Sequence, residues 1–134
     1  MIKPIVLYGD KILRKPTDYI REGSDIKSLI QDLWDTMYNA DGAGLAAPQI
    51  GVSMRVFVAD LPDQEWKQVF INPVINEKYG ERETVIEGCL SLPTISAHII
   101  REELDTLKQA TYHQPALHSV CAQLNQQPGY ILSE

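Results

Sequence analysis

The segment Ser24–Asn39 constrains the fold more than any other part of the sequence. Its apolar side chains recur at steps of three and four residues, which is the repeat of an α-helix with one buried face. Ser24 is a natural N-cap, and Asp25 then falls in the first turn, where the helix dipole favours a carboxylate. We therefore predict a helix that packs one face on the core. The apolar positions are Ile26, Leu29, Ile30, Leu33, Trp34 and Met37.

Short β-strands are predicted after this helix. Arg55–Leu61 and Val69–Asn76 are rich in β-branched and aromatic residues, which favour strands. Pro73 lacks a backbone N–H, so we expect it at a sheet edge or a strand end. Glu83–Ile86 and Ala97–Arg101 are predicted to be further strands on either side of a turn.

The last third of the sequence has a different composition. Glutamines become frequent after Glu102, and Pro115 and Pro128 interrupt the segment. Apolar residues keep helical spacing over Ala116–Asn125, which predicts a short helix there. We expect a single domain over residues 1–134, with an atypical or truncated part at about 104–134.

Charge and cysteine content exclude several classes of function. The net charge of −6 and the isoelectric point of about 5.0 repel phosphate backbones, so no direct nucleic-acid partner is expected. Two cysteines, Cys89 and Cys121, do not make a disulfide framework. No stretch is long enough to span a bilayer or to form a signal-peptide core. We expect a cytoplasmic protein with reduced thiols and no membrane partner.

A run of glycine, alanine and proline surrounds one amide side chain in Gly42–Gln49, which we interpret as a loop. Glycine lets a substrate backbone approach closely and permits positive φ. Gln49 on such a loop could donate to a carbonyl oxygen that becomes negative during hydrolysis. The alternative is a tight turn with Gln49 solvated or capping, and the residue types alone favour this alternative.

A second run, Glu87–Ser91, places a cysteine after a glycine. Cys89 could be a metal ligand, a nucleophile or a small buried hydrophobe, and the residue types leave these alternatives open. The backbone N–H of Leu90 could be a second donor to an oxyanion beside this cysteine.

Together the two runs resemble two of the three signature segments of the peptide deformylases. Gly42–Gln49 is similar to the family's G-x-G-L-A-A-x-Q, and Glu87–Ser91 to E-G-C-L-S. The resemblance extends over about residues 5–103. It implies an α+β fold, with mixed, mostly antiparallel sheets around a helix and an N-terminal packing helix. It also implies metal-dependent removal of the formyl group from N-formylmethionyl peptides during translation.

The resemblance implies roles for individual residues. Cys89 matches the thiolate ligand of a divalent metal, Fe²⁺ or alternatively Zn²⁺ or Ni²⁺. Gln49 and the N–H of Leu90 match the pair that binds the formyl oxygen, so they are our catalytic candidates. The expected partner is an N-formylmethionyl peptide or nascent chain, with the ribosome nearby. Substrate-binding roles are implied for Gly44, Glu87, Arg101, Ala43 and Val85, the last two lining a methionine pocket.

The family's third segment, which carries His-Glu-x-x-His, has no counterpart in this sequence. In the family its two histidines are metal ligands and its glutamate is the general base. Here His113 and His118 are five residues apart, and Pro115 lies between them. His118 and Cys121 could share a helix face. One register of the family pattern aligns its H-E-x-D-H with residues 124–128, none of which is a histidine or a glutamate.

Three interpretations follow from this missing segment. The chain could be a deformylase homologue that binds N-terminal peptides without catalysis. It could be an enzyme whose metal has unusual ligands such as His113, His118 or Cys121. It could also be a truncated or frame-altered product of an active gene, as the glutamine-rich segment after Glu103 indicates. The sequence favours weak or absent hydrolysis, because a single Cys ligand gives a metal no closed, oriented site.

Overall fold

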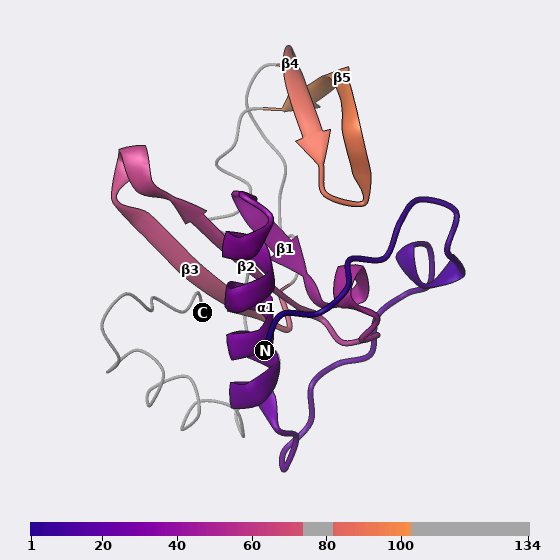
Figure 1. Cartoon of the computed structure of the whole chain (residues 1–134), viewed down its shortest axis with the longest axis vertical. Coiled ribbons are helices and arrows are strands. Elements are labelled where there is room, and N and C mark those ends of the chain that lie inside the picture. The colour runs from indigo at the N-terminus through magenta and orange to yellow at the C-terminus, as the bar shows by residue number, and fades with distance from the viewer. Residues whose placement is uncertain (74–81, 103–134) are drawn as a thin grey trace.

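The computed structural model describes residues 1–73 and 82–102 (Figure 1). A long helix, a three-stranded sheet and a separate hairpin make up this part of the chain. The elements in order are η1 Lys11–Leu13, α1 Ile26–Asn39, β1 Gly44–Ala46, η2 Ala47–Ile50, β2 Val56–Leu61, η3 Pro62–Gln64, β3 Trp66–Ile71, β4 Arg82–Cys89 and β5 Leu92–Glu102.

Helix α1 forms as the apolar repeat predicts, and all six predicted core residues are buried. The predicted cap is wrong by one residue. Asp25 is the N-cap, and its Oδ1 accepts a hydrogen bond from the N–H of Ser28 at 3.2 Å. The reason is that the chain enters the helix at Ile26, so the side chain that reaches the free N–H groups of the first turn belongs to Asp25.

The order of the first sheet is β1-β2-β3, and both pairings are antiparallel. Gly44–Ala46 was predicted as part of a loop, but it pairs with Phe57–Ala59 as strand β1. The prediction failed because glycine and alanine have low strand propensity. Pairing with β2 nevertheless satisfies the backbone N–H and C=O groups of this segment, and this does not depend on its side chains. The turn η2 follows at once and ends at Gly51, which has φ +82°.

The strand predicted at residues 69–76 begins three residues earlier and ends at Ile71. Pro73 lies just beyond this end, which confirms the prediction for it. Asn72 follows the last residue of the strand and has φ +49°. Its amide is fully buried and hydrogen-bonds to both the N–H and the C=O of Ile20. Asparagine tolerates this left-handed backbone better than most residues, so it can turn the chain and replace a missing backbone partner.

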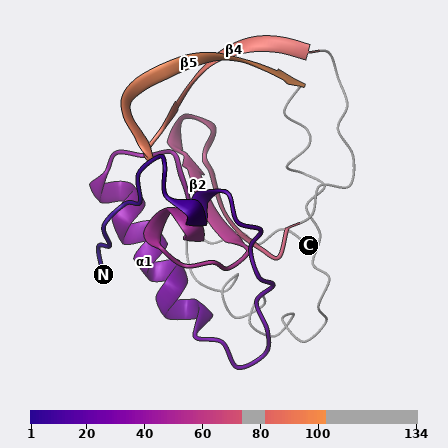
Figure 2. The same ribbon diagram turned by 90° about the vertical axis from the view of Figure 1, so that its right-hand side faces the viewer.

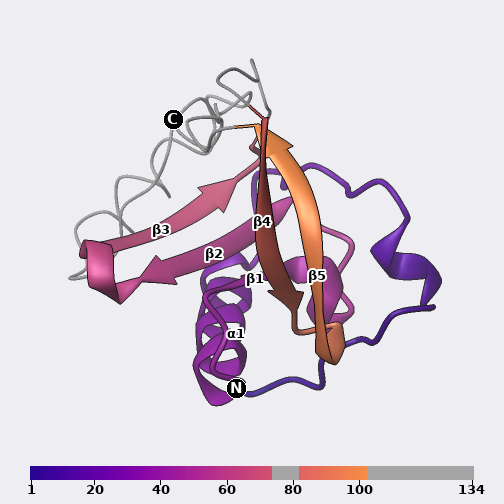
Figure 3. The same ribbon diagram turned by 90° about the horizontal axis from the view of Figure 1, so that it is seen from above.

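The β4–β5 hairpin contains both other predicted strands, and each is longer than predicted. Leu90 and Ser91 form its turn, and an irregularity in the pairing lies between Gly88 and Cys89. Seen from above, the hairpin crosses over β1 and η2 (Figure 3). The side view shows it arching over the helix and the sheet, and its turn is the end that meets them (Figure 2).

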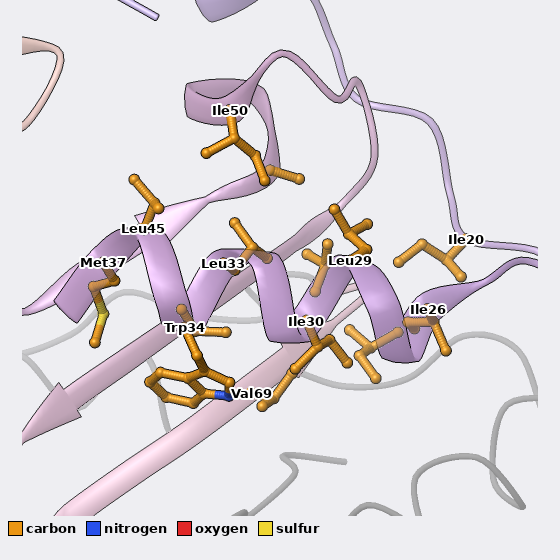
Figure 4. Close-up of a cluster of buried hydrophobic side chains, with 14 residues drawn as sticks. Ile20, Ile26, Leu29, Ile30, Leu33, Trp34, Met37, Leu45, Ile50 and Val69 are labelled. Carbon is orange, nitrogen blue, oxygen red and sulfur yellow. The ribbon is translucent and has the colours of Figure 1, made fainter. Parts of the chain in front are cut away.

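The main core lies between α1 and the first sheet (Figure 4). Leu33 and Met37 on the helix are fully buried together with Val58 and Val69 on the strands. Each such side chain contributes about 1.5–3 kcal/mol through burial. Leu90 from the hairpin turn packs against the edge of this cluster. The core therefore holds both α1 and the hairpin turn next to Cys89.

An α-helix with antiparallel sheets confirms the predicted α+β class. The predicted helix at Ala116–Asn125 lies outside the described residues. In the described ranges, no helix is both long and apolar enough to cross a bilayer.

Candidate functional site

A cleft of about 740 Å³ lies between the β1–η2 segment and the turn of the hairpin. Both signature runs contribute to its walls, although they are far apart in the sequence. The lining residues are Asp41, Gly42, Ala43, Gly44, Gln49, Gly88, Cys89, Leu90, Leu92 and Pro93.

The side-chain amide of Gln49 is held in one orientation. Its Oε1 accepts the N–H of Ala46 at 3.0 Å, within the same short turn. Its Nε2 donates to Ser91 Oγ at 3.1 Å and approaches Cys89 Sγ at 3.7 Å. Sulfur is a weak acceptor, so the N–H directed at Cys89 is the one that a stronger acceptor could take. Gln49 therefore caps its own turn, as one of the two alternatives predicts, while its Nε2 lies at the cleft. Its role as a donor to an oxyanion stays a prediction.

Cys89 is the last residue of β4, and its free thiol is exposed. The next residue, Leu90, begins the hairpin turn, so its backbone lies beside the sulfur. Cys89, Leu90 and Gln49 thus line the same cleft. Their roles as metal ligand and oxyanion donors stay predictions.

The two glycines of the first run serve close packing. Neither Gly42 nor Gly44 has a positive φ, which differs from the conformational role predicted for them. A Cβ added at Gly42 would lie 2.6 Å from Leu90 Cδ1, and one at Gly44 would lie 3.3 Å from the carbonyl oxygen of Val58. Gly42 therefore leaves the space that the hairpin turn occupies against the body of the domain.

Of the other predicted substrate-binding residues, Ala43 and Gly44 line the cleft. The structure describes only the backbone of Val85, Glu87 and Arg101. Val85 pairs with Ile99, Glu87 with Ala97 and Glu83 with Arg101, so all three lie on the hairpin. Their side chains are outside the described part, and their roles stay predictions.

The described residues do not make up a metal centre. Among the side chains that the structure describes, no three His, Cys, Asp or Glu residues are grouped so that they could hold an ion. In the part of the chain whose side chains are described, Cys89 is the soft ligand, whereas a catalytic zinc site uses three protein ligands. His113, His118 and Cys121 lie outside the described residues.

Ser91 is a functional candidate that the sequence did not single out. Its side chain is 5% exposed, and its Oγ is the strongest partner of the Gln49 Nε2. It belongs to the second signature run, but nothing in the sequence alone pairs it with Gln49. Asp41, Leu92 and Pro93 also line the cleft and had no predicted role there.

Comparison with known proteins agrees with this arrangement. A family model described as polypeptide deformylase matches residues 2–121. A peptide deformylase from Karelsulcia muelleri is 47% identical over 106 residues, which cover 76% of this chain and 56% of that protein. The chain thus spans less than two thirds of that relative's length.

Solved structures give the same result. A peptide deformylase from Thermotoga maritima superposes with a TM-score of 0.70 and 40% identity, covering 76% of this chain and 69% of that one. A class I type b peptide deformylase from Acinetobacter baumannii, solved with Met-Ala-Ser bound, gives a TM-score of 0.69 and 28% identity, covering 77% and 72%. Both signature runs, the shared fold and these similarities lead to one conclusion: the chain belongs to the peptide deformylase family.

Proposed function

We propose that the cleft binds the N-formylmethionyl end of a peptide or nascent chain, and that these 134 residues do not hydrolyse it at an enzymatic rate. In this proposal the Gln49 amide and the Leu90 N–H donate to the formyl oxygen. Ala43, Gly44 and Val85 contact the methionyl residue, and Glu87 and Arg101 brace the site and the peptide. The setting is translation in the cytoplasm, near the ribosome.

The clamped Gln49 amide carries this proposal. Two of its polar contacts, with Ala46 N–H and Ser91 Oγ, fix its plane before any ligand arrives. Nε2 also approaches the Cys89 thiol at 3.7 Å. A donor fixed in advance loses little entropy when a carbonyl oxygen binds, which is how oxyanion sites gain their selectivity.

The shape and lining of the cleft also support an N-terminal methionine. Ala43, Leu90 and Leu92 add apolar surface beside the polar donors. A cleft of this volume accommodates a short peptide end. A related protein from Acinetobacter baumannii was solved with Met-Ala-Ser bound.

We expect binding without hydrolysis because the sequence lacks the two histidine ligands and the glutamate base of the family's third segment. Cys89 is the one ligand that the two runs provide, and the sequence contains no His-Glu-x-x-His. Loss of a general base alone lowers a rate by about 10²–10⁴. A divalent ion, Fe²⁺, Zn²⁺ or Ni²⁺, needs further ligands to be oriented for catalysis.

Calorimetry with formyl-Met-Ala-Ser and with unformylated Met-Ala-Ser tests the proposal. We expect tighter binding of the formylated peptide, and we expect Gln49→Ala to remove the difference. Equal affinity of the wild-type chain for both peptides would contradict it.

Metal content and formate release should be measured on the same preparation. About one metal ion per chain, together with turnover that disappears in Cys89→Ala, would contradict the proposed binding without hydrolysis. It would show that the chain is an enzyme whose metal has an unusual ligand set. Absence of both leaves binding as the activity.

A further inference from the structure

The two proposed donors to the formyl oxygen come from different parts of the fold. Gln49 lies in η2, which continues the first sheet, whereas Leu90 lies in the turn of the β4–β5 hairpin. Their separation decides whether one oxygen can reach both, because a displacement of about 1 Å at a reacting centre can cost as much as 10²-fold in rate. A feature that fixes this separation therefore matters to the site.

The N-terminal segment, residues 3–8, bridges the two parts, and we call it the strap. The N–H of Val6 donates to the carbonyl oxygen of Gln49 at 2.8 Å. The N–H of Tyr8 donates to the carbonyl oxygen of Ser91 at 2.8 Å. The strap thus holds the two carbonyls at a fixed spacing.

Both ends of the strap are anchored. Near its start, the N–H of Lys3 donates at 2.9 Å to Oγ1 of Thr36, which is 1% exposed on α1. After Tyr8 the chain turns at Gly9, where φ is +102°, and the N–H of Asp10 donates to the carbonyl oxygen of Leu7 at 3.2 Å. These anchors fix the position of the strap relative to η2 and to the turn of the β4–β5 hairpin.

None of the strap residues lines the cleft. Their hydrogen bonds reach the backbone of Gln49 and Ser91, whose side chains in turn bond to each other at 3.1 Å. The strap can thus influence the formyl-binding groups without touching a ligand.

We propose that the backbone N–H groups of Val6 and Tyr8 are positioning groups that set the spacing between Gln49 and the Leu90–Ser91 turn. This inference rests on the proposed binding of the formyl oxygen by Gln49 and Leu90. It assigns to the N-terminal segment a role in selecting formylated over unformylated peptide ends.

Proline substitution tests the strap, because it removes one N–H while remaining compatible with an extended chain. Tyr8→Pro also removes a side chain whose hydroxyl lies 3.4 Å from the Arg14 guanidinium. Tyr8→Ala, which keeps the N–H, is therefore the matched control. Leu7→Pro is the second control, because among the described residues Leu7 hydrogen-bonds through its carbonyl oxygen and not through its N–H.

Two measurements on the full chain separate positioning from general stability. The first is the ratio of the affinities for formyl-Met-Ala-Ser and Met-Ala-Ser. We expect Tyr8→Pro to lower this ratio by about three- to tenfold, the worth of one hydrogen bond, and both controls to keep it within about twofold. The second is the position of the Gln49 side-chain NH₂ signals in ¹⁵N–¹H spectra of the peptide-free chain, assigned with Gln49→Ala.

The spectra test the strap independently of the proposed binding of formylated peptides. If the wild-type chain does not prefer formylated peptide, the proposed function fails, and the strap is judged on the spectra alone. Gln49 signals that move in Tyr8→Pro and Val6→Pro but stay in Leu7→Pro and Tyr8→Ala support the strap. Signals unchanged in both N–H deletions, in chains that still melt cooperatively, would overturn it.

Discussion

Gln49 Nε2 lies 3.7 Å from Cys89 Sγ, although Gln49 lies in η2 and Cys89 at the end of β4, 40 positions apart in the sequence. The contact joins the amide predicted to bind a formyl oxygen to the thiol predicted to bind a metal. Because Ser91 and Ala46 hold the rest of the amide, the sulfur receives the one donor that is weakly engaged. The two predicted functions therefore meet at one point in the cleft.

Cys89→Ala should separate metal binding from peptide binding. The change removes the one soft ligand among the described residues of the cleft, so any uptake of Zn²⁺ or Ni²⁺ through this site should be lost. The Gln49 amide keeps its contacts with Ala46 and Ser91, so affinity for formyl-Met-Ala-Ser in metal-free buffer should change by less than about threefold. Elemental analysis and calorimetry measure the two effects. A large loss of peptide affinity would mean that the sulfur itself contacts the peptide.

Ser91→Ala should free the Gln49 amide. The hydroxyl is 5% exposed and accepts from Nε2 at 3.1 Å, and its loss should cost about 0.5–1.5 kcal/mol of formyl-peptide binding. A double-mutant cycle with Gln49→Ala gives the measurement. If the two residues act together, the effect of Ser91→Ala should disappear when Gln49 is already alanine. Additive losses would show that Ser91 acts independently.

Leu33→Ala should destabilise the whole domain. Leu33 is fully buried between α1 and the first sheet, and truncation leaves a cavity. We expect the free energy of unfolding to fall by about 2–5 kcal/mol in urea titrations followed by circular dichroism. Lys27→Ala, on the exposed side of the same helix, should change it by less than about 0.5 kcal/mol. Equal losses in both variants would contradict the packing of α1.

An ion-pair cluster on the surface of α1 should make stability depend on pH. The Met1 amino group lies 2.9 Å from Asp32 and 2.5 Å from Asp35. The amine donates hydrogen bonds to Asp32 and to Asp35, which raise its pKa above 8.0, and the same bonds lower the pKa of both carboxyls below 3.8. The raised amine stabilises the fold below pH 8.0 and stops doing so as pH rises through its folded pKa. The lowered carboxyls stabilise it above pH 3.8 and stop doing so as pH falls through theirs.

The difference in unfolding free energy between the wild-type chain and Asp32→Asn should therefore be largest between about pH 4 and pH 8 and shrink on both sides. It should be small throughout and decrease in 1 M salt, because these groups are at the surface. Urea titrations at several pH values measure it. A difference that stays constant across this range would show that Asp32 contributes through packing.

The sequence alone determined the elements whose signal is local. The apolar repeat from Ile26 to Met37 fixed helix α1 and its buried face, because every residue of that pattern lies within a few turns of the next. The run Arg55–Leu61 predicted β2, which begins one residue later at Val56, and Pro73 marked the end of β3. The two signature runs likewise identified the family and placed Ala43, Gly44, Gln49, Cys89 and Leu90 among the candidates for the site.

Only the tertiary structure decided how those candidates meet. Strand β1 exists because Gly44–Ala46 pairs with β2, a contact that no propensity of glycine or alanine predicts. The bonds from Gln49 to Ser91, and from Val6 and Tyr8 to the two turns, join segments some 40 to 80 residues apart. Such contacts leave no periodic trace in the sequence, because their geometry depends on how the hairpin is seated on the core. Local order could thus be predicted from the sequence, whereas the clamped amide at the centre of the cleft is a property of the assembled fold.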